Sequence, residues 1–325
     1  MNKKIAIITD SSTGLKNNEL PDVFVIPLIV TATTTKIDGQ KEITTYHDGV
    51  DINNEKVAEL QKNSNIELKT SQASIGEAMD LVEKINDDYD EIFVLPIASS
   101  VSGSQNTWQI VAEDYPKLKV IRQHMGGPML KFIIYDFLAM KKNNLLTMEN
   151  INKYIENAKQ DLFGMLLVWD PRKVAKGGRV RNMAGAALSM LKLKLSVSLD
   201  ENGMKLYKIF TSVKSGIKRC FSYFEEKYKN FSLDNIKRLM FIRNKKETKA
   251  NDISNAINMV KDKLSSNNIK CEIYDKEIMP SVLISHTGSD ALIIAVQMKM
   301  IWANSLILIF WKAKVILKQT EDTMI

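Results

Sequence analysis

The sequence predicts an α/β protein with two domains: an N-terminal Rossmann-like domain built on a parallel sheet, and a C-terminal α/β domain with a mixed sheet. Three observations support this fold class. The chain has 325 residues, 45% of them hydrophobic, which is more than one small core needs. In the first half, apolar segments alternate with polar loops and helices, as in parallel sheets that are covered on both faces. In the second half, a hairpin interrupts this alternation.

Residues 1–150 form the expected N-terminal domain. Ser74 and Glu77 have the spacing of a capping box, which predicts that a helix begins there and ends near residue 86. Four apolar segments are predicted strands, at 4–9, 23–30, 91–97 and 117–121. Other helices are predicted at 56–61, through 108–111, and at 129–140.

Residues 151–297 form the expected C-terminal domain. Asn202-Gly203 lies between two apolar segments, 195–199 and 204–210, and predicts the turn of a hairpin. The remaining predicted elements are helices at 149–160, 214–228 and 251–264, and strands at 162–169, 238–242 and 270–274.

Residues 298–325 are a tail of uncertain structure. The apolar segment that leads into it, 291–311, contains Gln297, Lys299, Asn304 and Ser305. A membrane-spanning helix of about 20 apolar residues is therefore poorly supported. An interfacial helix, a core-packing extension and a frameshifted C-terminus all stay open.

Charge and cysteine content indicate which classes of protein this chain is not expected to belong to. The chain carries 45 Lys and Arg against 38 Asp and Glu, a net charge of +7. The basic residues are scattered and form no stripe with interleaved aromatics, so we expect no nucleic-acid partner. Transient contact with a membrane surface stays open. Two cysteines are too few for a disulfide scaffold, and the first apolar run ends at Asp10, shorter than the roughly 7–15 residues of a signal peptide core. A cytoplasmic protein is expected.

Polar loops follow several predicted strands. Loops rich in Ser and Thr at 10–13, 70–74 and 99–104 are expected to converge, because ligands of such sheets bind outside the carboxyl ends of the strands. No G-x-G-x-x-G, P-loop or metal-ligand motif is present, so no cofactor and no metal are expected. Ser102, His286 and Asp10 have the residue types of a hydrolase catalytic triad, but the sequence has no G-x-S-x-G nucleophile motif to support one. Each loop also has a purely structural interpretation, as a helix cap or a turn.

Five short motifs, taken together, identify a family. They occur in the order Asp10-Ser11-Ser12, Thr70-Ser71-Gln72-Ala73-Ser74, Ser99-Ser100-Val101-Ser102-Gly103, Lys176-Gly177-Gly178-Arg179 and Ser285-His286-Thr287-Gly288. The sequence resembles the DegV family of bacterial fatty-acid-binding proteins from residue 3 to about residue 297. The resemblance implies a binding protein that is not itself an enzyme. Such a protein encloses a long-chain fatty acid between two α/β domains and presents its carboxylate to a fatty acid kinase subunit. The kinase then forms an acyl phosphate for phospholipid synthesis.

The same resemblance implies the roles of individual residues. Thr70 and Ser102 would hydrogen-bond the carboxylate. His286 and Arg179 would lie near the head-group entrance, where Arg179 would help with the phosphate or the kinase. Ser71, Gly103 and Thr287 are further expected ligand-binding residues in the same motifs.

The sequence also departs from the family pattern. Ala73 replaces a proline, Ser104-Gln105-Asn106 replaces Thr-Tyr-Gln, Arg122-Gln123 replaces Asp-Ser, and Ser289-Asp290 replaces Pro-Gly. The alternative is a hydrolase or phosphoryl-transfer enzyme that uses the same loops.

Overall fold

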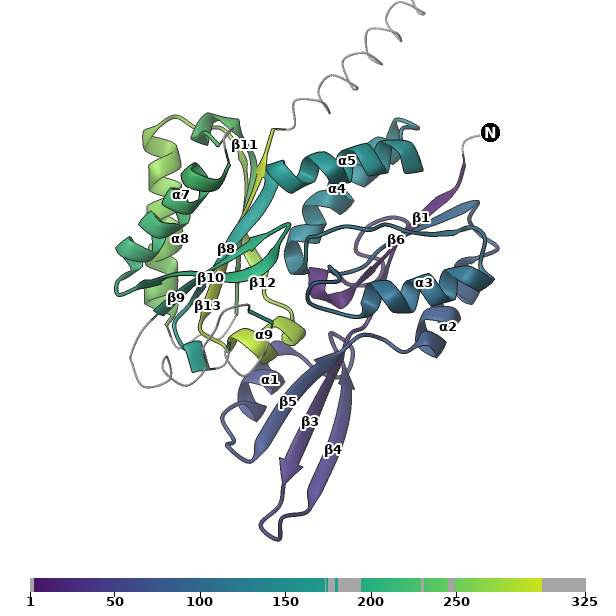
Figure 1. The fold of residues 1–325 in the computed structure, drawn as a ribbon, viewed down its shortest axis with the longest axis horizontal. Coiled ribbons are helices and arrows are strands. Elements are labelled where there is room, and N and C mark those ends of the chain that lie inside the picture. The colour runs from purple at the N-terminus through teal and green to yellow at the C-terminus, as the bar shows by residue number, and fades with distance from the viewer. Residues whose placement is uncertain are drawn as a thin grey trace, which may run out of the picture.

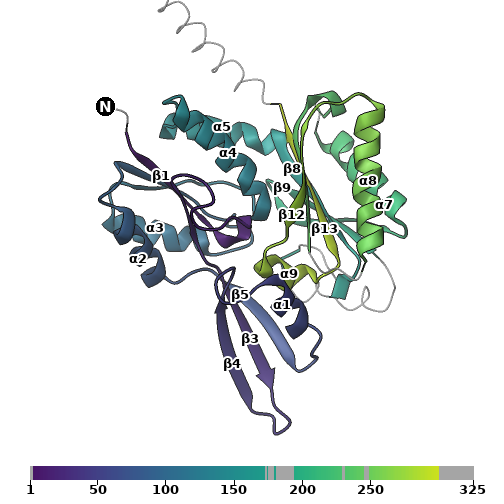
Figure 2. The ribbon, with the colours of Figure 1, turned by 180° about the vertical axis from the view of Figure 1, so that it is seen from behind.

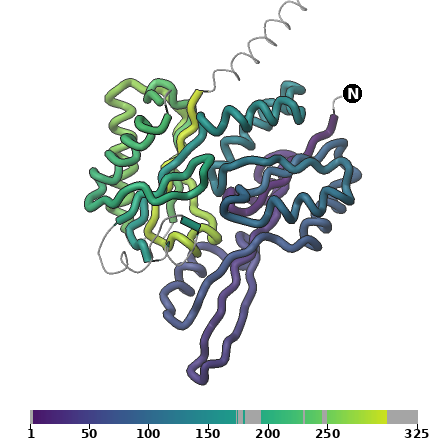
Figure 3. Tube along the Cα trace, viewed as in Figure 1, coloured from purple at the N-terminus to yellow at the C-terminus, as the bar shows by residue number. Residues whose placement is uncertain are grey.

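The computed structural model describes residues 3–172, 174, 179–180, 194–228, 231–244 and 249–299. It consists of two α/β halves that lie side by side, with a small sheet projecting from the first half (Figure 1). The chain passes through the first half, the projecting sheet and the first half again before it enters the second half (Figure 3).

The N-terminal half contains a parallel sheet, as predicted. Its strands lie in the order β2-β1-β6-β7, and their bounds are Val23–Ile26, Ile5–Asp10, Glu91–Leu95 and Leu118–Val120. Helices α2 (Ile75–Ile85) and α3 (Ser104–Asp114) pack on one face, and α4 (Leu130–Lys142) packs on the other. The predicted capping box at the start of α2 is present. This arrangement brings the loops after β1 and β6 to one edge of the sheet.

A three-stranded antiparallel sheet projects from this half. It has the order β4-β3-β5, with bounds Lys41–His47, Ile29–Thr35 and Ile66–Ser71 (Figure 1). The prediction of one strand at 23–30 is therefore wrong, because β2 and β3 belong to different sheets. Pro27 lies between them, and a proline has no N–H to donate to a continuous ladder. Helix α1 (Asn54–Leu60) connects β4 to β5 along the chain.

The C-terminal half contains the predicted mixed sheet. Its order is β10-β9-β8-β13-β11-β12, with bounds Gly203–Phe210, Lys194–Asp200, Leu162–Val168, Ala291–Met298, Ile236–Arg243 and Glu272–Ile278. The pairs are antiparallel except β11 with β12. Helices α7 (Val213–Lys227) and α8 (Ala250–Ser266) cover the outer face (Figure 2). The inner face packs on α4 and α5 (Met148–Asp161). The predicted hairpin turn is present, and Gly203 has the positive φ of 86° that this turn requires.

Strand β13 changes the interpretation of the apolar segment at 291–311. Every residue of β13 is buried, and the strand lies between β8 and β11 at the centre of the sheet (Figure 3). For these residues the interfacial-helix interpretation is wrong, and the segment supplies a core strand. Residues 300–325, most of the predicted tail, lie outside the described residues. No helix in the described part of the chain is long and apolar enough to cross a membrane.

Four short helices complete the described elements. They are η1 (Ser11–Thr13), η2 (Gly127–Met129), η3 (Leu233–Asn235) and α9 (Ser281–Thr287). Helix α9, which the sequence analysis did not predict, carries the His286-Thr287 motif. It lies between α1 and the C-terminal sheet in the two opposite views of Figures 1 and 2.

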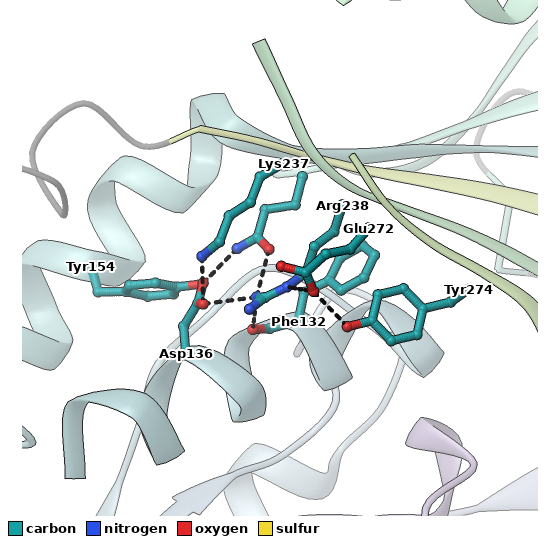
Figure 4. Close-up of polar contacts among 8 residues, drawn as sticks. Phe132, Asp136, Tyr154, Lys237, Arg238, Glu272 and Tyr274 are labelled. Carbon is teal, nitrogen blue, oxygen red and sulfur yellow. Dashed lines mark hydrogen bonds and ion pairs between the residues drawn. The ribbon is translucent and has the colours of Figure 1, made fainter. Parts of the chain in front are cut away.

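A polar cluster joins the two halves on the inner face of the large sheet (Figure 4). Asp136 of α4 lies at its centre, 2.7 Å from Lys237 Nζ and 2.7 Å from an Arg238 nitrogen. It also accepts hydrogen bonds from Tyr154 at 2.8 Å and from Gln297 at 2.7 Å. Burial alone would raise the pKa of Asp136, but the charges of Lys237 and Arg238 hold it below its usual value. The carboxylate therefore stays ionised between α4 and the sheet.

Candidate functional site

A cavity of about 380 Å³ lies between the two halves. The inner face of the C-terminal sheet provides one wall, through Leu166, Leu199 and Ile293. Loops at the strand ends of the N-terminal half, together with α9, provide the others. Most of the lining is apolar and also includes Leu28, Ile97, Val101, Met129, Val174, Val180, Met204, Val282 and Leu283. The volume is within the roughly 300–1,000 Å³ of small-molecule sites.

The structure places all seven predicted site residues on the wall of this cavity. They are Thr70, Ser71, Ser102, Gly103, Arg179, His286 and Thr287. Two separate parts of the N-terminal half and two of the C-terminal half contribute them. The fold therefore brings together motifs that are far apart in sequence.

Thr70 and His286 form a direct polar contact between the two halves at this site. Thr70 is in β5 and His286 is in the last turn of α9, and Thr70 Oγ1 lies 2.6 Å from His286 Nε2. Burial, and then the charge of Arg179, lower the pKa of His286 to about 4. The imidazole is therefore neutral near pH 7.

Ser102 and Gly103 belong to the loop that leads into α3. The Ser102 hydroxyl lies 3.0 Å from the Ser104 hydroxyl and accepts a hydrogen bond from Ser104 N at 3.2 Å. Gly103 lies against the side chain of Gln72, since a Cβ at position 103 would be 2.8 Å from its amide nitrogen. This close approach connects the loop to the motif that contains Thr70.

The other predicted residues have different surroundings. Arg179 is half-buried, and residues 175–178 lie outside the described residues, including the predicted Lys176-Gly177-Gly178. The Thr287 hydroxyl donates to Leu283 O at 3.0 Å within α9, so it is already satisfied by its own helix. Ser71 is exposed at the end of β5.

The predicted convergence of three Ser/Thr loops is correct for only two of them. Loops 70–74 and 99–104 line the cavity, whereas loop 10–13 is buried behind it. The carboxylate of Asp10 accepts from Ile97 N at 2.7 Å and from Ser12 N at 3.1 Å. It thereby holds the chain at the end of β6. The structure gives no support to the catalytic triad of Ser102, His286 and Asp10, because His286 contacts Thr70.

Several further residues on the wall were not predicted. They include the polar residues Gln72, Ser100, His124 and Asp200, and also Gly203. Gln72 and Ser100 lie inside the quoted motifs. Gly203 carries no such signal, because its role depends on a tertiary contact: a Cβ there would lie 3.2 Å from Ser100 Oγ. The hairpin turn thus packs against the loop that contains Ser102.

The arrangement suits an amphiphile with one anionic end. The apolar walls favour a long hydrocarbon group, whose burial is worth roughly 25 cal/mol per Å². The hydroxyl groups, the neutral imidazole and the guanidinium supply donors, and hydrogen bonds to a charged group contribute about 1.5–3 kcal/mol each.

Comparisons with known proteins agree on one family. A family model described as "Uncharacterised protein, DegV family" matches residues 4–299. A DegV domain-containing protein of Mycoplasma pneumoniae is 28% identical over 300 residues, which cover 89% of this chain and 96% of that protein.

Two solved structures share the fold. One is from Thermus thermophilus, is described as the fatty acid binding of a DegV family protein, and has a TM-score of 0.74 at 17% identity. The other is the fatty acid kinase (Fak) B3 protein of Streptococcus pneumoniae loaded with linoleic acid, with a TM-score of 0.69 at 14% identity. Each match covers 91% of this chain and 99% of the other. With a family model that spans nearly all of its described length, this chain belongs to the DegV family.

Proposed function

We propose that this protein binds a long-chain fatty acid in the cavity between its two halves and presents the carboxylate to a partner kinase, which forms an acyl phosphate for phospholipid synthesis. The observation that carries the proposal is one largely apolar cavity whose polar residues include the Thr70–His286 pair, Ser102 and Arg179. The fatty acids named for the Thermus and Streptococcus proteins support it.

The apolar walls account for retention of the ligand. An acyl chain of about fifteen methylenes, at roughly 0.8 kcal/mol each, gains about 12 kcal/mol on burial before the costs of association. Only part of this gain appears as affinity. It is still large enough for the ligand to leave slowly.

The head group would lie between the motifs of the two halves. Ser102 offers a short hydroxyl donor. Thr70 and His286 share a hydrogen bond, so the pair has one further donor to offer: the Thr70 hydroxyl when the neutral ring is protonated at Nε2, or the ring N–H when it is protonated at Nδ1. These donors replace the water that a carboxylate loses when it enters a cavity. Arg179, on the same wall, adds a positive charge near the anion.

The first test removes a hydroxyl from the head-group site. Thr70→Ala and Ser102→Ala are each expected to weaken fatty-acid binding by about 1–3 kcal/mol, because a buried anion loses one donor. Displacement of a fluorescent acyl probe by unlabelled fatty acid gives the affinities.

Thr45→Ala is the matched control, since Thr45 is an exposed hydroxyl in β4 of the same small sheet and is not among the described residues that line the cavity. It is expected to bind nearly as well as the wild type. Wild-type affinity in both Thr70→Ala and Ser102→Ala would place the head group elsewhere in the cavity.

The second test separates binding from presentation. The guanidinium of Arg179 can engage phosphate oxygens with two parallel hydrogen bonds. Arg179→Ala is therefore expected to lower acyl-phosphate formation by the cognate kinase about tenfold or more, while fatty-acid affinity changes much less.

Arg179→Lys is expected to restore only part of the transfer rate, because an ammonium lacks the planar fork. The measurements are the rate of acyl-phosphate formation and the affinity for the acyl probe. Normal transfer by the alanine variant would assign Arg179 a structural role.

A further inference from the structure

Helix α9 carries His286 into the cavity, but its two ends are held by residues of the N-terminal half. The helix has seven residues, and such short helices are not stable without tertiary contacts. Its N-cap residue is Pro280, which forms no side-chain capping hydrogen bond. The contacts that replace the missing cap come from the segment 48–61.

Asp48 takes the place of the N-cap side chain. One carboxylate oxygen accepts a hydrogen bond from Ser281 N at 3.1 Å, and the other accepts from Ser11 Oγ at 2.8 Å. Asn54 completes this contact, because its side chain donates to Met279 O at 2.8 Å and accepts from Ser281 Oγ at 3.1 Å. Asp48 is only 4% exposed, so its acceptor groups are directed at these partners and away from water.

Gln61 holds the opposite end of α9. Its amide nitrogen lies 2.9 Å from Ile284 O and 3.3 Å from Ser285 O, to both of which it donates. Ile284 O also accepts from the N–H of the C-cap residue Gly288 at 2.8 Å, so Gln61 adds a second donor to this carbonyl and supplies one to Ser285 O. His286 follows directly after these two residues.

The sheet that contains Thr70 also supports Asp48. Val30 of β3 pairs with Thr70, and Ile29 of β3 pairs with His47. Asp48 follows His47 and donates its N–H to Leu28 O at 2.8 Å. The threonine and the carboxylate that holds the start of α9 are therefore fixed to the same three strands.

We propose that Asp48 and Gln61 are positioning residues, which set the geometry of the Thr70–His286 pair by fixing the two ends of α9 against the sheet that carries Thr70. Neither residue lines the cavity among the described residues. The consequence for ligand affinity rests on the proposed function, whereas the position of His286 is a property of the free protein.

The experiment is an NMR titration of the histidine side chains in ligand-free protein. Asp48→Asn and Gln61→Met should each loosen α9 and admit water to His286, so its pKa should rise from about 4 by at least one unit toward the ordinary 6.5. Burial raises the pKa of Asp48 to about 6, so its side chain is largely uncharged where His286 titrates, and loss of its charge contributes little to the expected shift. The chain has three histidines, and His286→Gln identifies the signal.

Asp51→Asn is the matched control. Asp51 lies three residues beyond Asp48 and is exposed. One of its carboxylate oxygens lies 3.2 Å from His47 Nδ1. The carboxylates of Glu77 and Asp51 raise the pKa of His47, so this variant should lower the pKa of His47 and leave His286 unchanged.

An unchanged pKa of His286 in folded Asp48→Asn and Gln61→Met would overturn the proposal. If Asp48→Asn does not fold, Gln61→Met decides, because Gln61 is only half-buried.

A second measurement compares the acyl-probe affinity of Gln61→Met with that of the Gln61→Met, Thr70→Ala double variant. Gln61→Met is expected to lower the affinity several-fold in the wild-type background and to change it little in the Thr70→Ala background. An equal loss of affinity in both backgrounds would contradict the proposal. If the wild type binds no fatty acid, the proposed function fails while the titration still stands.

Discussion

Asp136→Ala is expected to lower the free energy of unfolding by about 3–5 kcal/mol, the largest loss of stability anticipated for a single substitution in the described polar contacts. The substitution removes the anion between Lys237 and Arg238 and leaves both cations next to the inner face of the sheet (Figure 4). It also removes the acceptor of Tyr154 and Gln297. Chemical denaturation at pH 7 measures the change.

Glu272→Ala is the matched control for this substitution. Glu272 also pairs with Arg238, at 3.2 Å, but its side chain is 54% exposed. Exposed ion pairs contribute roughly 0–1 kcal/mol, so a small loss is expected. Similar losses in the two variants would show that the buried cluster does not hold the halves together as described.

The second large expected effect is the loss of stability at acid pH that results from burying neutral His286. Between pH 7 and pH 4, the free energy of unfolding of the wild type is expected to fall by roughly 3 kcal/mol more than that of His286→Gln. The folded state holds the pKa of His286 at about 4, against an ordinary 6.5, because burial and then Arg179 disfavour the charged ring. The unfolded chain therefore binds the proton first as the pH falls. Stability is lost from about pH 6.5 downward.

Asp48 acts in the opposite direction and is present in both proteins. Burial raises its pKa to about 6, so the folded state binds its proton more readily than the unfolded chain does, and this contribution is lost as the pH rises through 6. Comparing the wild type with His286→Gln at each pH cancels the contribution of Asp48. Parallel pH curves for the two proteins would contradict the burial of a neutral His286.

Local signals in the sequence predicted those parts of the fold that depend on neighbouring residues. The Ser74–Glu77 capping box and the Asn202-Gly203 turn are examples, because each specifies backbone conformation within a few positions. The alternation of apolar strands with polar loops likewise predicted the parallel sheet.

The errors arose where tertiary contacts decide the structure. Strand β4 is exposed along most of its length and has no apolar pattern, so the projecting sheet carried little signal. Helix α9 is short and depends on Asp48 and Gln61, which lie more than two hundred residues away in sequence. Strand β13 merges with an apolar segment that continues beyond it, and periodicity alone cannot show where a buried strand ends.

The candidate site residues were proposed through a resemblance and would not have followed from single residues. Thr70 and His286 are 216 positions apart, and their contact depends on both α9 and β5. Gly203 and Asp200 were missed because they reach the cavity only through the packing of a hairpin against the loop that contains Ser100.

Native mass spectrometry of the purified protein tests the central claim most directly. The protein is expected to carry an added mass that is released on denaturation and identified by mass spectrometry of the lipid extract as a long-chain carboxylic acid. Stripped protein should take up added fatty acid with a stoichiometry of one. Repeated preparations without bound lipid, together with no uptake of added fatty acid, would contradict the assignment of the cavity to an acyl chain.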